Sequence, residues 1–335
     1  MGKTYRWGIM GAGIIAGKLA EALARCGGAE LAFVGSKSPE RAEAFARRYG
    51  AEGWGTYEDL FDRGNVDVVY VATTHNLHRA NARMALERGK PVLVEKPFTV
   101  NAEEAGDLID LAGARGLFLM EAMWTRFLPA TVRLRSLLAE GAVGRPRYAD
   151  ISFGNFIQPK YEARVRDPAL AGGVTLDMGI YPISFACHVL GERPSDIRAS
   201  CVMTDQGVDE LAAYQFRFPG GALAQIGTSF TLKMENRATI YGTEGYVEFP
   251  SFPTGDRFTV HRHGGTNEVS STEEVRLEHE ENGFVYQVRE VQRCLEAGLT
   301  ESPVMPLAET RELMAVMDTI RAQWGLRYAF ERREV

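Results

Sequence analysis

The hydrophobic pattern in the first third of the chain alternates between short apolar runs and amphipathic segments. The apolar runs have the length of strands, and the segments between them repeat apolar residues at helical spacing. This alternation is typical of βαβ units, so it predicts a parallel sheet with helices between its strands. The expected strands are RWGIM, ELAFVGS, VDVVYVAT, PVLVEKP and LFLMEAM, and the expected helices run from Ile14 to about Arg25 and over PERAEAFARRY, HRANARMALERG and NAEEAGDLIDLAGARG.

The pattern changes after about Met123, where strand-like segments follow one another closely, joined by Gly, Pro and Asp turns. Such spacing predicts a predominantly antiparallel sheet with few helices between its strands. The chain is therefore expected to hold a dinucleotide-type α/β domain followed by a second domain built on this sheet. The strand-like segments are RYADISFGNF, IRASCVMT, LAAYQFRF, ALAQIGTSF, RATIYGTEGYVEF and DRFTVHRH, with helical patterns over DMGIYPISFACHVLG and ETRELMAVMDTIRAQW.

Composition and charge narrow the class of protein. The 335 residues are 45% hydrophobic and carry a net charge of −6, so nothing favours nucleic acid or an anionic membrane surface as a partner. The four cysteines are widely and irregularly spaced, which argues against a disulfide framework and fits a reducing compartment. No signal peptide pattern and no apolar run near the length of a membrane span is evident, so a cytoplasmic location without membrane binding is expected.

A glycine-rich motif, Gly11-x-Gly13-x-x-Ala16, stands between the first expected strand and the first expected helix. Gly11 permits a tight turn, Gly13 lets the backbone approach a pyrophosphate, and Ala16 permits close helix–strand packing. The first helical residues, Ile14 and Ile15, supply oriented N–H groups to the phosphates. The alternative is a glycine-rich turn that binds no ligand, but the βαβ context favours a dinucleotide.

The end of the second strand indicates which dinucleotide is bound. NAD-selective folds usually carry an acid there, whereas this chain has Ser36 and Lys37, with Glu40 the first acid to follow. A hydroxyl beside a cation suits a 2′-phosphate, and Arg41 can stack on adenine or add charge. The alternative is that Ser36 and Lys37 are solvated loop residues. We expect NADP(H), with NAD still possible.

Hydroxyls and imidazoles follow the central strand in VATTHNLH. Thr73, Thr74, His75 and His78 are placed at the carboxyl edge of the sheet, where they can contact the nicotinamide ribose. For His78, packing at a helix N-terminus is an equally good interpretation.

Five ordered motifs resemble those of a known family. GAGIIA, VATTHNLH and VEKPF occur in the order and context of the Gfo/Idh/MocA oxidoreductases. MEAMWTRFLP and GGVTLDMGIY resemble the branch of dimeric dihydrodiol dehydrogenases and NADP-dependent D-xylose dehydrogenases. The resemblance covers nearly the whole chain. It implies a Rossmann domain over residues 1–122 and a C-terminal α/β domain over residues 123–335, with a large open, mainly antiparallel sheet through which the protein would form a homodimer.

The resemblance also assigns site residues. The family's Glu-Lys-Pro falls on Glu95, Lys96 and Pro97, with the lysine beside the nicotinamide and the substrate hydroxyl, and its Asp-x-Gly-x-His/Tyr motif falls on Asp177, Gly179 and Tyr181. Many relatives have His where Tyr181 stands, and the dihydrodiol branch has Tyr. The resemblance also implies cofactor contacts for Trp124, Arg126 and Arg164, and a substrate contact for Trp124 as well.

The residue types suit alcohol oxidation without the family name. Hydride transfer from an alcohol needs a base for the hydroxyl proton, and carbonyl reduction needs the same group as an acid. A tyrosine with an ordinary pKa near ~10 is a poor base, but the ammonium of Lys96 would favour the phenolate of Tyr181. Asp177 lies four residues before Tyr181, on one face of a helix, and could orient Lys96 or bind a substrate hydroxyl. The alternatives are a helix-end acid and a buried aromatic with a hydrogen-bonded tip.

Other signals carry less weight. Phe153, Asn155 and Phe156 are candidates for lining the substrate pocket, although alternation along a strand makes a core position equally good. His261 and His263 lack a third ligand pattern, so no metal is expected. STEEVRLEHEEN is interpreted as a solvated acidic face.

The chain is therefore predicted to be an NADP(H)-dependent oxidoreductase acting on a small molecule: a sugar, a polyol or a trans-dihydrodiol. One alternative is a non-catalytic NADP-binding sugar sensor on the same scaffold, since a fold does not settle function. Another is a reductase of a different carbonyl or of a tetrapyrrole. The sequence leaves open the substrate, the physiological direction and the cis or trans state of Pro97.

Overall fold

The computed structural model describes residues 3–191 and 193–331. The chain forms two compact units. The first holds the residues up to Phe127 together with Glu280–Met314, and the second holds Leu128–His279 together with the chain from Ala315 onward. This division differs from the predicted break at residues 122/123, because a late segment of the chain returns to the first unit.

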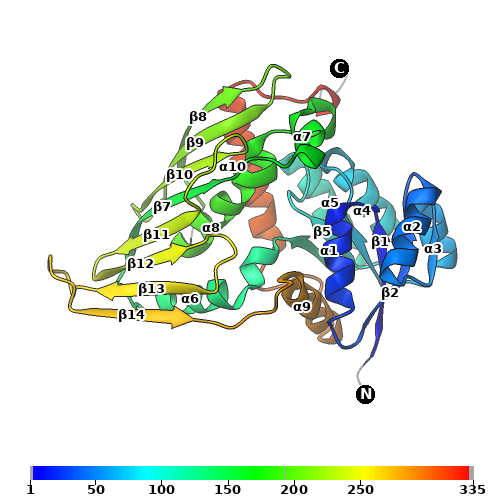
Figure 1. Cartoon of the computed structure of the whole chain (residues 1–335), viewed down its shortest axis with the longest axis horizontal. Helices are drawn as coiled ribbons and strands as arrows, with labels where there is room; N and C mark the ends of the chain where they lie inside the picture. The colour runs from blue at the N-terminus through cyan, green and yellow to red at the C-terminus, as the bar shows by residue number, and fades with distance from the viewer. Residues whose placement is uncertain (1–2, 192, 332–335) are drawn as a thin grey trace. The chain divides into compact units, whose positions relative to one another are not determined.

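The first unit is built on a six-stranded sheet in the order β3-β2-β1-β4-β5-β6, with every neighbouring pair parallel (Figure 1). β4 and β5 are buried at every position, as expected for parallel strands covered on both faces. The predicted Rossmann-type fold is confirmed. The strands are β1 (Tyr5–Met10), β2 (Ala29–Gly35), β3 (Gly53–Gly55), β4 (Val68–Val71), β5 (Val92–Glu95) and β6 (Leu119–Ala122).

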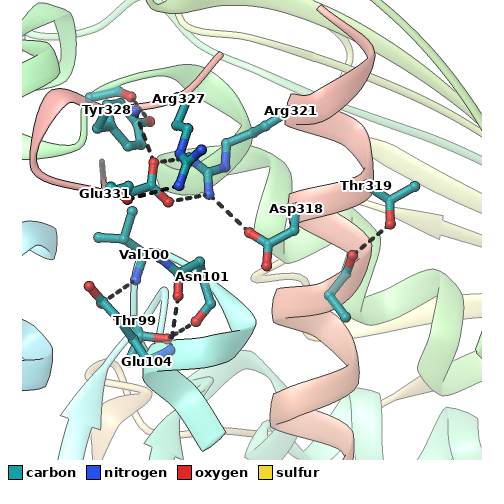
Figure 2. Close-up of polar contacts among 12 residues, drawn as sticks. Thr99, Val100, Asn101, Glu104, Asp318, Thr319, Arg321, Arg327, Tyr328 and Glu331 are labelled. Atoms are coloured by element: carbon teal, nitrogen blue, oxygen red, sulfur yellow. Dashed lines mark hydrogen bonds and ion pairs between the residues drawn. The ribbon is translucent and has the colours of Figure 1, made fainter. Parts of the chain in front are cut away.

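Helix ends in this unit follow the capping residues in the sequence. At the start of α5 (Ala102–Arg115), the Asn101 side chain accepts a hydrogen bond from the Glu104 backbone N–H at 2.9 Å (Figure 2). The same helix ends at Gly116, which has a positive φ of 60°. The other helices are α1 (Ile14–Leu23), α2 (Pro39–Tyr49), α3 (Tyr57–Arg63) and α4 (His78–Glu87).

Two short elements of the first unit are absent from the sequence prediction. β3 has three residues, two of them glycines, so it shows no apolar run. α3 begins at a capping box in which the Thr56 hydroxyl and the Asp59 carboxylate each accept a hydrogen bond from the other's backbone N–H. That box is readable in the sequence and would have predicted the helix.

The segment Glu280–Met314 joins the first unit through α9 (Phe284–Glu296), which packs against α1. The Asn282 side chain donates to the Lys18 carbonyl at 2.8 Å, and the Gln292 side chain donates to the Gly28 carbonyl at 2.6 Å. These bonds satisfy a carbonyl within α1 and a carbonyl in the turn before β2, so the segment is tied to the outer layer of this unit. α10 (Leu307–Gln323) begins in the first unit and ends in the second.

The second unit is built on an eight-stranded sheet in the order β14-β13-β12-β11-β7-β10-β9-β8. Neighbouring strands are antiparallel except β7 and β10, which are parallel, so the predicted mainly antiparallel sheet is confirmed (Figure 1). The strands are β7 (Pro146–Gly154), β8 (Asp196–Met203), β9 (Asp209–Arg217), β10 (Leu223–Ser229), β11 (Arg237–Gly242), β12 (Gly245–Pro250), β13 (Arg257–Arg262) and β14 (Ser271–Arg276).

The acidic stretch STEEVRLEHEEN, predicted to be a solvated face, begins with an edge strand, β14, which was not predicted. Its side chains are largely exposed, and charged side chains on an edge strand discourage pairing with other chains.

One face of the second sheet is covered by helices. α8 (Ile180–Leu190) packs on β7 and β10, and α6 (Pro129–Ala139) packs on β13. Along β7 the side chains alternate, with Ala149 and Ile151 buried toward the helices. Besides α3, the helices α6, α9 and α7 (Pro159–Arg166) were not predicted from the sequence, and α7 buries only Val165.

One helical segment, Pro168–Leu190, is long and apolar enough by composition to cross a membrane, with a mean hydropathy of 1.2. Of its most apolar 18-residue stretch, 89% is buried inside the described part of the fold, which is the environment of a core helix.

Candidate active site

Four of the predicted segments meet at one edge of the Rossmann sheet. β1 lies between β2 and β4, and β4 pairs with β5, all parallel, so their carboxyl ends point the same way. From β1 the chain adds β2 and β3 on one side of the sheet and then β4, β5 and β6 on the other. Ligands bind at such switch points in open α/β sheets. The segments are Gly11–Gly13 after β1, Ser36–Lys37 after β2, Thr73–His78 after β4 and Glu95–Lys96 at the end of β5.

The glycine loop has the geometry that a dinucleotide requires. Gly11 has φ +112°, and a Cβ there would lie 2.7 Å from the Ala72 carbonyl oxygen, so only glycine fits. Gly13 is the N-cap of α1, and a Cβ there would meet open space, which leaves room for a phosphate against the helix N-terminus. Ala16 is fully buried against the sheet, while Ile14 is 49% exposed and Ile15 half-buried. These features fit a bound NAD(P).

Residues after β2 surround the place of the adenine ribose in such folds. Ser36 is buried, and its hydroxyl accepts a hydrogen bond from the Ser38 backbone N–H at 3.2 Å. Lys37 is exposed, and the Arg41 guanidinium donates to the Ala12 carbonyl in the glycine loop at 3.4 Å. Arg41 therefore connects α2 to the phosphate-binding loop. In contrast, Glu40 is held by the Ser38 hydroxyl at 2.7 Å, within its own helix turn.

The Glu95-Lys96-Pro97 segment forms a turn fixed by buried side chains. Glu95 accepts a hydrogen bond from the Tyr70 hydroxyl through one oxygen and from the Lys96 backbone N–H, at 3.1 Å, through the other. The Lys96–Pro97 peptide bond is cis, which answers the question that the sequence left open. Lys96 itself is half-buried at the carboxyl edge of the sheet.

A second buried carboxylate, Glu121 on β6, supports the same turn and was not singled out from the sequence. Its Oε1 accepts the Phe98 backbone N–H at 3.1 Å, and the residue is fully buried. Burial raises the pKa of Glu121 to about 7, although the nearby Arg126 guanidinium lowers it. The Thr310 hydroxyl also acts to lower that pKa, although within the described chain Oε2 of Glu121 makes no hydrogen bond of acceptable geometry.

The segment after β4 is tied to the lysine turn by His78. This residue is the first of α4 and is fully buried, with Nδ1 2.8 Å from the Pro97 carbonyl oxygen and Nε2 3.1 Å from the Thr73 carbonyl oxygen. The position matches the packing alternative for His78 and makes it a bridge between two strand ends.

The neighbouring side chains form a local network at the same edge. The Thr73 hydroxyl accepts a hydrogen bond from the Asn81 side chain at 3.1 Å, and the Thr74 hydroxyl donates to Asn76 at 2.7 Å. His75 is buried, with its ring centroid 5.8 Å from that of His78.

Trp124 and Arg126 follow β6 in the first unit. The Trp124 ring stacks on Phe284 of α9, with centroids 5.2 Å apart. Arg126 is almost fully buried and makes two 2.7 Å hydrogen bonds to the Glu309 carboxylate. Its guanidinium therefore has an ion-pair partner inside the unit, and Glu309 is a second residue that the sequence analysis did not find.

In the second unit the structure brings Asp177, Arg164 and Tyr181 to one region. Arg164 on α7 donates to Asp177 Oδ1 at 2.9 Å, and Asp177 is 8% exposed. Asp177 lies in a π-helical turn, Thr175–Gly179, that leads directly into α8, where Tyr181 is half-buried. Turns of this kind occur frequently at functional sites.

The three substrate-lining candidates on and after β7 have different environments. The Phe153 ring packs edge-on against the Tyr181 ring, with centroids 5.7 Å apart, so these two belong together. Asn155 accepts hydrogen bonds from Lys233 at 2.9 Å and Asn236 at 3.2 Å. Phe156 is 68% exposed.

No group of three or more His, Cys, Asp or Glu side chains with a metal-binding arrangement occurs among the described residues. His261 instead contacts the Glu248 carboxylate at 2.9 Å and the Thr272 hydroxyl at 3.2 Å, on neighbouring strands.

Glu121 and the Tyr70–Glu95 contact show what sequence reasoning missed. Each is a polar group in an apolar strand, Glu121 in LFLMEAM and Tyr70 in VDVVYVAT. A buried polar side chain needs a partner, so a carboxyl group inside a run of apolar residues is itself a signal of a structured site.

Comparison with known proteins supports the geometry. Residues 5–123 match the oxidoreductase family with an NAD-binding Rossmann fold, and residues 131–248 match the GFO/IDH/MocA C-terminal domain. The mouse (Mus musculus) trans-1,2-dihydrobenzene-1,2-diol dehydrogenase is 33% identical over 98% of this chain and 100% of its own length.

Solved structures agree with this assignment. An aldose-aldose oxidoreductase from Caulobacter crescentus, complexed with glycerol, has a TM-score of 0.86 and 25% identity over 97% of this chain and 99% of its own. A 3-ketoreductase from Actinomadura kijaniata, in complex with NADP and TDP-benzene, has a TM-score of 0.84 and 26% identity over 96% and 98%. The predicted resemblance is confirmed: the chain belongs to the Gfo/Idh/MocA family of NAD(P)-binding oxidoreductases.

Proposed function

We propose that this oxidoreductase uses NADP(H) to interconvert a hydroxyl and a carbonyl group on a sugar, a polyol or a trans-dihydrodiol, with Lys96 and Tyr181 in proton transfer. The observation that carries the proposal is the edge of the Rossmann sheet. There the half-buried Lys96 is held at the end of β5, two strands from the open glycine loop after β1.

The chemistry divides between the nucleotide and the side chains. When bound, the nucleotide accepts or donates the hydride at its nicotinamide ring. In the oxidation direction the substrate C–H electron pair leaves as hydride and the O–H proton passes to Tyr181. In the reduction direction Tyr181 returns that proton. In this proposal the role of the Lys96 ammonium is to favour the Tyr181 phenolate during turnover, and the role of Asp177, oriented by Arg164, is to bind a substrate hydroxyl.

A polyhydroxylated substrate is supported by the residue types in the second unit. Asp177 and Arg164 offer a carboxylate and a guanidinium that can hydrogen-bond several hydroxyls, and the Phe153 ring beside Tyr181 offers an apolar face. The relatives' names point the same way, since they describe a dihydrodiol dehydrogenase and an aldose-aldose oxidoreductase.

NADP(H) in preference to NAD(H) is supported by the residues after β2. Ser36 and the exposed Lys37 replace the acid that would bind a free ribose 2′-OH, and Arg41 lies against the glycine loop. A structural relative from A. kijaniata was solved with NADP.

A homodimer through the sheet of the second unit is also part of the proposal. Tyr148, Tyr241, Tyr246 and His261 are register partners on four adjacent strands and form a row of ring contacts. Tyr241 is 42% exposed. A continuous aromatic row on a sheet face is the composition that protein interfaces favour. Analytical ultracentrifugation of the chain and of Tyr241→Glu tests it: the dimer is expected to be lost in the variant.

The proposed reaction is tested by a substrate panel read through NADPH absorbance. Purified protein is assayed with D-xylose, D-glucose, a polyol and a trans-dihydrodiol, each with NADP+ and with NAD+. Turnover with at least one hydroxylated substrate, faster with NADP+, is expected. Activity confined to NADPH oxidation would instead favour a reductase of another carbonyl. Tight NADP binding without activity on any substrate would favour the sensor.

A further inference from the structure

A buried polar cluster lies behind the segment that carries Asp177 and Tyr181. Asp209, at the start of β9, accepts the Thr175 backbone N–H at 2.8 Å and also the Thr175 hydroxyl, both through Oδ2. The Tyr214 hydroxyl lies 2.9 Å from the Thr175 hydroxyl. All three residues are fully buried. Each therefore has to find its hydrogen bonds inside the fold.

The cluster is closely fitted to the turn that precedes the π-helical segment. Gly173 has φ +116°, and a Cβ there would collide with Oδ1 of Asp209. That oxygen has no hydrogen-bond partner among the described residues. Burial raises the pKa of Asp209, and the two hydrogen bonds from Thr175 lower it. Thr175 therefore offsets part of the cost of burying the Asp209 carboxylate.

The end of the chain closes the other side of the same turn. The Tyr328 hydroxyl donates to the Gly172 carbonyl, and the Tyr328 backbone N–H donates to Glu331 at 2.9 Å. Arg321, which is 4% exposed, binds both Glu331 oxygens, at 2.9 and 3.0 Å, and Asp318 at 2.9 Å (Figure 2). The Gly172–Gly173 turn is therefore held by contacts with Asp209 of β9 on one side and with Tyr328 of the C-terminal segment on the other.

The contacts that hold this turn lie next to the residues proposed to meet the substrate. Thr175 is the first residue of the π-helical turn, Asp177 is two residues further on, and Tyr181 is the second residue of α8. A shift of Thr175 would pass along the turn to Asp177 and Tyr181, because every residue from Ala171 to Ile180 is buried and cannot adjust independently.

We propose that Thr175 and Asp209 are positioning residues, whose hydrogen bonds set the place of the π-helical turn and so the aim of Asp177 and Tyr181 at the substrate. This inference rests on the proposed function, since it presumes that Asp177 and Tyr181 meet the substrate. The cost of burying Asp209 supports it, because buried ionic groups are often no better for stability than apolar residues of similar volume.

The test compares Thr175→Val, which removes the hydroxyl but keeps the shape, with Thr175→Ser, which keeps the hydroxyl. Thr175→Val is expected to lower kcat by about 10- to 100-fold, since small misplacements of reacting groups cost up to about 10²-fold. The KM for NADP+ is expected to stay within about twofold, because the glycine loop and the residues after β2 lie in the other unit, and Thr175→Ser is expected to recover at least about a third of kcat. The thermal midpoint of each variant is recorded beside the kinetics.

A kcat of Thr175→Val equal to the parent's, with a lower thermal midpoint, would overturn the proposal and leave a purely structural cluster. If Thr175→Val does not fold, Tyr214→Phe, which removes the hydroxyl on the far side of Thr175, takes its place with the same two expected outcomes. Tyr181→Phe is assayed in parallel. Parent-like turnover in Tyr181→Phe contradicts the proposed function itself, whereas an inactive Tyr181→Phe beside a fully active Thr175→Val contradicts the positioning role alone.

Discussion

Glu121 in the first unit and Asp209 in the second solve the same problem in different surroundings. Each is a fully buried carboxylate that accepts a backbone N–H close to a proposed site residue: Phe98, two residues after Lys96, and Thr175, two residues before Asp177. Each has a pKa raised by burial. The difference lies in what compensates the charge.

Glu121 is compensated mainly by a cation, whereas Asp209 is compensated mainly by hydroxyl and amide donors. The Arg126 guanidinium lowers the pKa of Glu121 but is itself bound to Glu309, while Asp209 has two bonds from one threonine. The Arg126 charge is shared between Glu121 and Glu309, whereas both Thr175 donors bind Asp209 alone. The ionised form of Glu121 is therefore stabilised less directly than that of Asp209. We therefore expect Glu121 to respond to pH and Asp209 to respond to the loss of one hydroxyl.

Among the variants that probe the two supporting carboxylates and the residues around them, the largest effect is expected at Asp177, on the substrate side of the comparison. Asp177→Ala should lower kcat/KM for the hydroxylated substrate by about 10³-fold, because a charged hydrogen-bonding group and its orientation by Arg164 are lost together. Nucleotide affinity, measured by NADPH fluorescence, should change by less than about threefold. The matched control is Asp196→Ala, an exposed aspartate on β8, which should behave as the parent. Equal losses of substrate and nucleotide binding would contradict the proposal that Asp177 binds the substrate and not the nucleotide.

The second effect is a pH dependence of stability at Glu121. Its folded-state pKa, about 7, lies above the ordinary value of 4.5, so the folded state holds the proton more tightly than the unfolded chain. The resulting stability is present below about pH 4.5 and is lost as pH rises through about 7, a change of about 3 kcal/mol. Glu121→Gln lacks this titration. Its thermal midpoint relative to the parent should therefore rise from pH 5 to about pH 7 and stay level from there to pH 9, and a constant difference over the whole range would contradict the assignment.

The third effect concerns the nucleotide. Ser36→Asp combined with Lys37→Ala restores an acid at the end of β2 and removes a cation, so the ratio of kcat/KM for NADP+ over NAD+ should fall by about 10²-fold. Lys37→Ala alone separates the contribution of charge from that of the acid. An unchanged ratio in the double variant would show that these residues do not read the 2′-phosphate.

The smallest effect is expected from the loss of the Glu121 hydrogen bond itself. Glu121→Leu leaves the Phe98 N–H unpaired and should lower kcat about tenfold, whereas Glu121→Gln keeps an acceptor and should lose less than about threefold. Similar kcat values for the two variants would mean that the bond does not position the Lys96 turn.

Much of the fold was accessible from the sequence because its signals are local. Asn101 and Gly116 mark the ends of α5, and Gly11 occupies a turn that excludes a side chain. The residues that support the site were not accessible in this way. Glu121 contacts a backbone group 23 residues away, and Asp209 contacts one 34 residues away, so no local pattern reveals either pairing.

The unpredicted elements have the same explanation. α9 and the residues just before it bond to backbone carbonyls of α1 and of the turn before β2, more than 260 residues away along the chain. β14 is mostly polar and shows no apolar alternation, because it is an exposed edge strand. Among the described strands it pairs with β13 alone.

The central claim is that Lys96 and Tyr181 carry proton transfer while other residues hold the nucleotide. The most direct test is the turnover of Lys96→Ala and Tyr181→Phe at saturating NADP+, with NADPH affinity measured on the same samples. We expect turnover to fall by about 10²- to 10⁴-fold in each variant, the usual contribution of a positioned acid or base, with NADPH affinity within about threefold of the parent. Parent-like turnover in either variant would contradict the account.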